Sequence, residues 1–291
     1  MQLVSLSEIK CNQVPEIDFD RPVVMGVLNV TPDSFSDGGL YLDAEAAVAH
    51  AREMAADGAD IVDVGGESTR PGAEPVAEDV ELRRVVPVVE RIATEGGPRV
   101  SVDTSKLAVA EAALQAGARI VNDVTALRHA PQIAGLVAQT GATVVLMHML
   151  GEPRTMQRDP RYDDVVSDVR AFLEERLAFA VGEGVPEERV WLDPGIGFGK
   201  TVEHNLELLR RLDQIAAIGR PLVVGTSRKS FLGRITGRDE TDRVAATVAT
   251  NVMAYERGAA VFRVHDVAPV ADALRVAAAT VAGQWTSTTS G

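Results

Sequence analysis

Three polar residues stand where short apolar runs end, and their types suit the recognition of a small ring. Asp103 ends RVSVD, Asn122 follows RIV, and Asp193 ends VWLD. An ionised carboxylate only accepts hydrogen bonds, whereas an amide both donates and accepts. Together they suit a ligand edge with adjacent N–H donors and ring nitrogens, such as the 2-amino-4-oxo edge of a pterin or guanine. For each residue alone, a polar network that only stabilises the fold is the alternative.

Basic groups at two further strand ends suit an anionic ligand. Arg263 and His265 stand two residues apart in VFRVH, so their side chains point the same way along a strand. The arginine offers a planar fork of donors for a phosphate. Lys229, in GTSRK, is placed to donate to a ligand carbonyl. For Arg263 the alternative is an ion pair with an acidic neighbour such as Asp266.

Asn29 ends the run VVMGVLN and is expected near Arg263 and His265 in a closed barrel. An amide oxygen is a hard ligand, which suits Mg²⁺ in a shell made mostly of water and phosphate oxygens. Because an asparagine after a strand is also a common turn former, Asn29 alone does not define a metal site.

These residues belong to eight β-branched, strand-length runs that alternate with helix-type stretches. Such alternation indicates a parallel sheet with helical crossovers. Eight units predict an α/β fold, a (β/α)8 TIM barrel, with the active site at the C-terminal ends of the strands. The runs are VVMGVLN, DIVDVG, RVSVD, RIVND, TVVLMH, VWLD, PLVVGTSRK and VFRVH. Helices are expected at about 43–58 (capped by Asp43 and ended by Gly58), 79–95, 105–116, 131–140, 163–184, 203–218, 240–257 and 267–282.

The length of 291 residues is compatible with a single domain, 1–291. The barrel should span about 22–282, after a lead-in of 1–21 that could form a hairpin across the barrel bottom. The last residues, about 283–291, have the composition of a mobile tail. Three long loops on the predicted catalytic face are rich in Gly, Pro, Ser and Asp, as lids often are. They are 30–42, 65–78 and 149–162.

Composition excludes several classes of protein. The net charge of −13 is a poor match to nucleic acid, which needs a basic surface. No apolar stretch is long enough for a bilayer-spanning helix, so no membrane partner is expected. The one cysteine, Cys11, allows no internal disulfide. The N-terminus does not have the pattern of a signal peptide. A cytoplasmic protein is therefore expected.

Motifs for other chemistries fail on spacing. In DPGIGFGKT only three residues separate Gly195 from Gly199, where a phosphate-binding P-loop needs four before Gly-Lys. No G-x-G-x-x-G opens a helix, as a dinucleotide fold requires. Neither GESTR nor GTSRK is the G-x-S-x-G of a hydrolase. We also expect no Ser-His or Cys-His nucleophile pair.

Seven motifs, in order, closely resemble those of the dihydropteroate synthase family of folate biosynthesis, and the resemblance covers about 22–282. They are GVLNVTPDSFSDGG (26–39), DVGGESTRPGA (63–73), VNDV (121–124), MHMLGEPRTMQ (147–157), DPGIGFGK (193–200), GTSRKSFLG (225–233) and RVHDV (263–267). The resemblance implies condensation of 6-hydroxymethyl-dihydropterin pyrophosphate with p-aminobenzoate. The products are 7,8-dihydropteroate and pyrophosphate. It also implies Mg²⁺ as cofactor, a homodimer, and inhibition by sulfonamides.

The resemblance also implies roles for individual residues. The pterin pocket would consist of Asp103, Asn122, Asp193 and Lys229. The pyrophosphate and Mg²⁺ site would consist of Asn29, Arg263 and His265. Thr69 and Arg70 would contact substrate, and Ser227 would meet the aminobenzoate carboxylate. The aminobenzoate ring would lie among Phe35, Pro71 and Phe198. We also expect Asp63, Met147, Gly225 and Arg228 to contact substrate.

The implied chemistry is a dissociative substitution in which the C–O bond to pyrophosphate breaks before the arylamine attacks. Charge stabilisation would then be the main contribution. Two alternatives remain. A pterin-binding barrel that transfers a methyl group to a corrinoid protein would not need Arg263, His265 or the first two long loops. A degenerate paralogue that keeps the barrel only as a binding or structural protein would have lost some strand-end residues.

Overall fold

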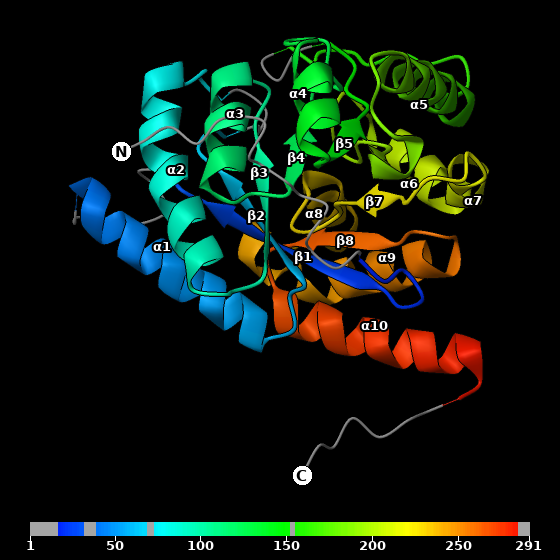
Figure 1. Cartoon of the computed structure of the whole chain (residues 1–291). Helices are drawn as coiled ribbons and strands as arrows, with labels where there is room; N and C mark the ends of the chain where they lie inside the picture. Colours follow the sequence, from blue (N-terminus) through cyan, green and yellow to red (C-terminus); the bar gives the residue numbers. More distant parts are fainter. Residues whose placement is uncertain (1–16, 32–38, 69–72, 152–154, 285–291) are drawn as a thin grey trace.

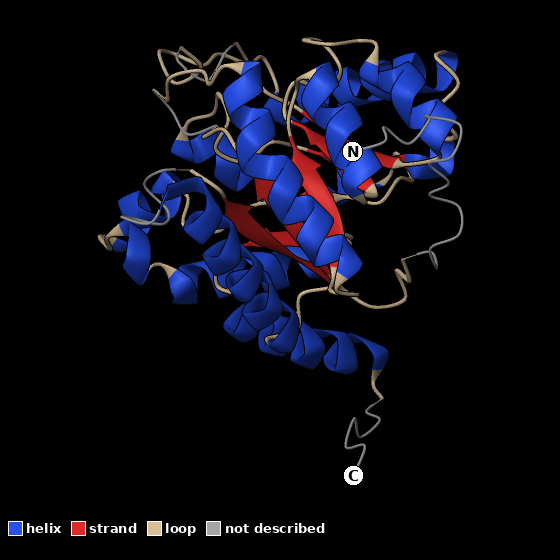
Figure 2. Ribbon diagram, turned by 60° about the vertical axis from the view of Figure 1, so that its left-hand side comes forward, coloured by secondary structure: helices blue, strands red, loops and turns tan. Residues whose placement is uncertain are grey.

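Eight parallel strands form an almost closed barrel in the computed structural model, which describes residues 17–31, 39–68, 73–151 and 155–284. The strand order is β6-β5-β4-β3-β2-β1-β8-β7. A single bridge between Leu192 and Leu222 joins the two ends of the sheet. Helices surround the strands on the outside (Figures 1 and 2). The predicted α/β barrel is confirmed.

The strands lie where the apolar runs predict them, and nearly all are buried on both faces, as parallel strands are. They are β1 (Val23–Asn29), β2 (Ile61–Gly65), β3 (Arg99–Asp103), β4 (Ile120–Asp123), β5 (Thr143–Met147), β6 (Val190–Asp193), β7 (Val223–Val224) and β8 (Val261–Val264). The helices are α1 (Gly39–Ala56), α2 (Glu78–Thr94), α3 (Leu107–Ala116), α4 (Ile133–Thr140), α5 (Val165–Gly182), α6 (Val202–Arg210), α7 (Leu212–Ala216), α8 (Ser230–Thr236), α9 (Val244–Glu256) and α10 (Val267–Ala282).

Some helix boundaries differ from the sequence predictions. Helix α1 begins at Gly39, so position 43 lies inside the helix and not at its start, because the preceding Leu and Tyr are compatible with helix. The predicted helix 203–218 is two helices, α6 and α7, joined at Arg211. Helix α8 was not predicted; Gly233 within it reads as a helix breaker, and Gly237 ends it with a φ of 72°.

Two apolar clusters pack on the two sides of the barrel wall. The larger lies between the strands and the helices. The smaller fills the barrel interior near the N-terminal ends of the strands. It consists of Val23, Met25, Ile61, Ile120, Val145, Trp191, Val223 and Val261. Because side chains alternate along a strand, the residues two positions later on these strands also point inward, one layer closer to the C-terminal end.

The lead-in covers the lower end of the barrel without forming a strand in its described part. Ile17 packs against the inner cluster, and the rings of Phe19 and Trp191 form a T-shaped pair with 5.5 Å between their centroids. Residues 17–22 contain no hairpin. Residues 1–16, with Cys11, lie outside the described residues, as do 285–291 of the predicted tail.

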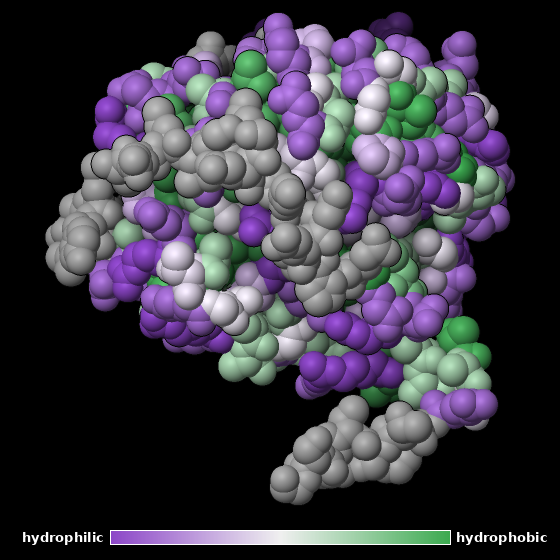
Figure 3. All heavy atoms as spheres, in the orientation of Figure 1, coloured by the Kyte–Doolittle hydropathy of each residue, from purple (hydrophilic) through white to green (hydrophobic). Residues whose placement is uncertain are grey.

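Hydrophilic residues dominate the face of the molecule in Figure 3, and apolar surface gathers near the C-terminal end of α10, at the lower right. Val276 and Val281 of α10 are 68 % and 64 % exposed. None of the described helices is long and apolar enough to cross a bilayer.

Candidate active site

The strand register brings the predicted residues together at the C-terminal end of the barrel. Gly65 pairs with Asp103, and Asp103 pairs with Asn122. On the other side, Met147 pairs with Asp193. A cavity of about 30 Å³ at this end is lined by ten predicted residues: Asp103, Asn122, Met147, Asp193, Phe198, Gly225, Ser227, Lys229, Arg263 and His265. Val124 and Ile196, which were not predicted, complete its wall.

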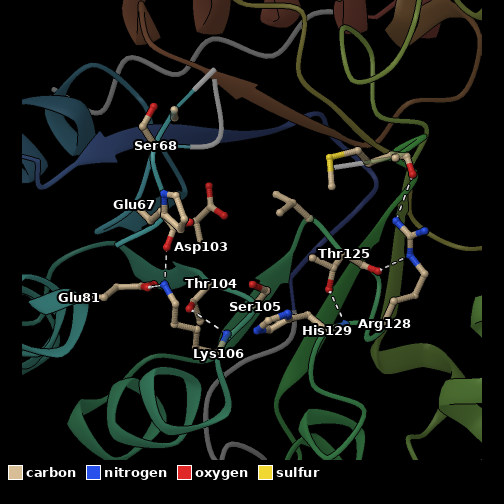
Figure 4. A pocket seen from close by; sticks show the side chains of 15 residues that line it. Glu67, Ser68, Glu81, Asp103, Thr104, Ser105, Lys106, Thr125, Arg128 and His129 are labelled. Carbon is tan, nitrogen blue, oxygen red and sulfur yellow. Dashed lines mark hydrogen bonds and ion pairs between the residues drawn. The ribbon is translucent and has the colours of Figure 1, made fainter. Parts of the chain in front are cut away.

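A larger cavity of about 480 Å³ adjoins the first and shares Asp103 and Val124 with it. The first cavity alone is smaller than a bicyclic ring, and ligand sites usually have a volume of about 300–1,000 Å³. In Figure 4, Lys106 points toward Glu67 and Glu81 on one side of the larger cavity. The two cavities together give room for a small-molecule substrate.

Arg263 lies between two carboxylates in the 30 Å³ cavity, which we call the strand-end cavity. Its Nε donates to Asp63 Oδ2, and its Nη2 donates to Asp103 Oδ2, both at 2.7 Å. Burial alone would lower the pKa of Arg263, but the charges of Asp63 and Asp103 outweigh burial and raise it. Burial raises the pKa of Asp103, and the Arg263 charge offsets only part of that effect. Asp266, the acidic neighbour considered as an ion-pair partner of Arg263, pairs with Arg228.

Asp193 and Lys229 also line the cavity. Asp193 Oδ1 accepts a hydrogen bond from the backbone N–H of Gly195 at 2.7 Å. Burial raises the pKa of Asp193, whereas the Gly195 hydrogen bond and the Lys229 charge lower it. The ammonium of Lys229 lies 3.9 Å from the centroid of the Phe198 ring, a cation–π distance.

Ser227 and His265 come from the ends of neighbouring strands and contact each other. Ser227 Oγ lies 3.1 Å from the backbone nitrogen and 3.1 Å from Nδ1 of His265. The sequence did not reveal this contact, which forms because strands β7 and β8 bring together residues 38 positions apart. Ser227 also accepts a backbone hydrogen bond, which is a positioning contact.

Arg228 and Asn29 lie on a second side of the barrel mouth. With His265 and Asp266 they line a groove of about 720 Å³. Arg228 has a φ of 57°, a strained conformation for a residue with a side chain. Its guanidinium donates to both oxygens of Asp266, at 3.0 and 2.5 Å. The Arg228–Asp266 ion pair therefore helps to fix the backbone of the two neighbouring residues, Ser227 and Lys229.

Lys200 and His148 form a buried pair that the sequence did not predict. Lys200 Nζ lies 2.9 Å from His148 Nδ1 and donates to Phe198 O at 2.9 Å. Burial is the main reason that the pKa of Lys200 falls to about 7 and that of His148 to about 2. A neutral His148 can accept from Lys200. The pair joins the loop after β5 to the loop that carries Phe198.

Other predicted residues stand elsewhere. Asp63 was expected to touch substrate, but its side chain is fully buried (0 % exposed) and lines neither cavity. Asp63 is the third residue of β2, one layer below Gly65, the last residue of that strand. Phe35, Thr69, Arg70 and Pro71 lie outside the described residues.

Comparison with known proteins identifies the family. The family of pterin binding enzymes matches residues 25–265. A dihydropteroate synthase of Escherichia coli K12 is 46 % identical over 94 % of this chain and 96 % of its own length. This chain belongs to the dihydropteroate synthase family. A solved dihydropteroate synthase of Yersinia pestis, in a sulfonamide drug complex, is 45 % identical with a TM-score of 0.86, covering 91 % of this chain and 96 % of the other.

A second solved dihydropteroate synthase, from Xanthomonas albilineans, is in complex with 7,8-dihydropteroate. It is 46 % identical to this chain, with a TM-score of 0.82, and the match covers 91 % of this chain and 96 % of the other. Both solved dihydropteroate synthases share the barrel that carries the strand-end residues described above. The resemblance seen in the seven motifs is thus confirmed along most of the chain.

The side chains at the barrel mouth fit the Mg²⁺ that the dihydropteroate synthase motifs imply. A Cβ at Gly65 would lie 3.8 Å from both Asn29 Oδ1 and Asp103 Oδ2, so the glycine keeps open the space between these two oxygens. In the described part of the chain, no three His, Cys, Asp or Glu side chains gather as a metal site. An amide oxygen and a carboxylate oxygen are hard ligands, which would suit an ion bound mostly by water and substrate oxygens.

Proposed function

We propose that this protein is a dihydropteroate synthase, which joins 6-hydroxymethyl-7,8-dihydropterin pyrophosphate to p-aminobenzoate and releases pyrophosphate. The observation that carries the proposal is the strand-end cavity, which brings the acceptors of Asp103, Asn122 and Asp193 together with the cations of Arg263 and Lys229. The Xanthomonas albilineans relative, in complex with 7,8-dihydropteroate, supports the same product here.

The pterin ring would lie among the acceptors of the cavity. Asp193 and Asn122 would accept from the N–H donors of the ring edge, and Lys229 would donate to the ring carbonyl. Buried polar groups must be paired, so a ligand without this donor pattern would leave them unsatisfied. The carboxylates of Asp103 and Asp193 would also stabilise positive charge on the ring as pyrophosphate leaves.

The pyrophosphate would lie where Asn29, Arg263 and His265 meet. The C–O bond breaks, its electron pair leaves with pyrophosphate, and the arylamine nitrogen forms the new C–N bond and then loses a proton. We propose that Asn29 Oδ1 holds Mg²⁺, which supplies positive charge for the leaving group when bound. Arg263 and His265 would donate to the same oxygens, so that electrostatic stabilisation dominates.

The aminobenzoate would lie beside Phe198 and Ser227, with Ser227 meeting its carboxylate. Sulfonamides should then compete with p-aminobenzoate, as the Yersinia pestis complex suggests. Steady-state inhibition tests this: the apparent inhibition constant should rise linearly with p-aminobenzoate concentration. Normal turnover in a large excess of sulfonamide over p-aminobenzoate would contradict the aminobenzoate site.

We also propose that the protein works as a homodimer in the cytoplasm. Three helices that contact one another, α6, α8 and α9, each carry an exposed apolar side chain. These side chains are Leu206, Ile235 and Met253. Apolar surface shared by three adjacent helices fits an interface between copies. A dimer by analytical ultracentrifugation that dissociates on Ile235→Asp would support this; a monomeric parent protein would contradict it. The one cysteine suits a reducing compartment.

A further inference from the structure

Asp63 lies beneath the candidate active site and contacts two of the residues that line it. One carboxylate oxygen, Oδ2, accepts from Asn122 Nδ2 at 2.9 Å and from Arg263 Nε at 2.7 Å. The other oxygen, Oδ1, is buried and has no hydrogen-bond partner within the described part of the chain. Asp63 therefore acts on the cavity through a single atom.

The contact with Asp63 fixes the orientation of the Asn122 amide. A carboxylate only accepts, so the amide nitrogen must face Asp63, and the carbonyl oxygen is turned the other way. The two ends of an amide have nearly the same shape, so without Asp63 the group could flip. A flipped amide would present N–H donors to the N–H donors of a pterin edge.

The same oxygen fixes the plane of the Arg263 guanidinium. Asp63 holds Nε and Asp103 holds Nη2, from two different strands. This leaves Nη1 for a ligand. The arginine lines the cavity with its orientation set by two carboxylates, so it needs little reorganisation when a ligand binds.

We propose that Asp63 is a positioning residue of the pterin site, which orients Asn122 and Arg263 and does not touch the substrate. The proposal rests on the proposed function, because it assumes that the cavity binds a pterin. It assigns Asp63 a task that only an acceptor oxygen at the Oδ2 position can perform.

Three substitutions of Asp63 separate the positioning role from a role in the fold or in supplying negative charge. Asp63→Ala removes the acceptor, and Asp63→Leu removes it without leaving a large cavity. Asp63→Asn keeps one oxygen, which can take the Oδ2 position while its amide nitrogen takes the unpartnered Oδ1 position. Calorimetry with 6-hydroxymethylpterin, which has no pyrophosphate, should give affinity losses of about tenfold or more for Ala and Leu. The loss for Asn should be within about threefold.

A double-mutant cycle with Asn122→Ala tests whether Asp63 acts through Asn122. In the Asn122→Ala background, Asp63→Ala should cost clearly less pterin affinity than in the parent protein, because the amide that it orients is gone. Equal losses in both backgrounds would overturn the proposal. Equal weakening by Asn, Ala and Leu would also overturn it, since charge and not the acceptor atom would then be decisive.

The parent protein is the control for the proposed function itself. If it binds 6-hydroxymethylpterin and Asp63→Ala binds equally well, the positioning role fails and the proposed function stands. If the parent protein does not bind the pterin, the proposed function fails. If Ala and Leu both fail to fold while Asn folds, Asp63 is a requirement of the barrel, and the positioning role is overturned.

Discussion

Ser227 Oγ lies 3.1 Å from two nitrogens of His265, the backbone nitrogen and Nδ1. The backbone N–H can only donate, so it occupies one lone pair of the hydroxyl. The hydroxyl keeps a proton and a second lone pair for the imidazole. It can donate to a neutral His265, or it can accept from a protonated one and keep its proton for the aminobenzoate carboxylate. In both states it directs Nε2 away from Ser227.

Loss of the Ser227 hydroxyl should weaken the help that His265 gives to the departure of pyrophosphate. Ser227→Ala is expected to lower kcat/KM for dihydropterin pyrophosphate by about tenfold, because the imidazole then loses the hydrogen bond that directs Nε2. The exposed Ser230→Ala, three residues later, is the matched control. Parent-like kinetics of Ser227→Ala would show that the contact has no part in turnover.

Arg263→Lys should lower turnover far more than it lowers affinity for a pterin without pyrophosphate. Lysine keeps a positive charge beside Asp63 and Asp103 but loses the planar fork. Arg263→Ala is a poorer test, because it leaves two buried carboxylates uncompensated at a cost of about 3–5 kcal/mol. Turnover and calorimetry measure the two effects. Equal losses in both would mean that Arg263 serves the fold or the pterin pocket alone.

Asp193→Asn should weaken pterin binding by about tenfold or more, because an amide places donors against the donors of the ring. The backbone N–H of Gly195 would occupy the one remaining acceptor oxygen. Asp272→Asn, on the exposed face of α10, is the control for charge alone. Unchanged pterin affinity by calorimetry would remove Asp193 from the recognition edge.

Gly195→Ala should destabilise the protein more than Gly219→Ala does. Both glycines have positive φ values, 66° and 85°, so both substitutions strain the backbone by roughly 1–2 kcal/mol. Only at Gly195 would the new Cβ meet a neighbour, His148 O at 1.8 Å, whereas nothing lies within 4 Å at Gly219. Urea unfolding of the two variants measures the difference. Equal losses would show that the loop after β6 moves away freely.

Stability should rise with pH through the titration of Lys200. Burial lowers the folded pKa from its ordinary value of 10.5 to about 7, and the charge of Lys229 adds to this while that of Asp193 opposes it. Between these values the unfolded chain binds the extra proton, so alkaline pH favours the folded state. Urea unfolding from pH 7 to 9.5 should show a smaller rise for Lys200→Met than for the parent protein. Equal slopes would contradict this assignment.

The sequence predicted the barrel and most of the strand-end cavity because both follow from a short-range pattern. A β-branched run that ends in a polar residue specifies a strand and the residue at its mouth. Asp103, Asn122 and Asp193 were found in this way. Asp63 carries the same chemistry but stands one layer deeper, and only the register of β2 against β3 reveals that depth.

Contacts between distant residues could not be predicted. Nothing in the sequence indicates that Lys200 is buried against His148, 52 residues away, because a lysine is usually exposed. The Ser227–His265 contact depends on the pairing of β7 with β8 and on the strained backbone at Arg228. Helix α8 was hidden by Gly233, which local propensity disfavours in a helix.

Formation of 7,8-dihydropteroate by the purified protein is the most direct test. The assay supplies dihydropterin pyrophosphate, p-aminobenzoate and Mg²⁺, with an EDTA control. The account predicts product and pyrophosphate in equal amounts, and loss of both in EDTA. No product from a folded protein that still binds pterin would contradict the synthase and favour a degenerate binder or methyl transfer to a corrinoid protein.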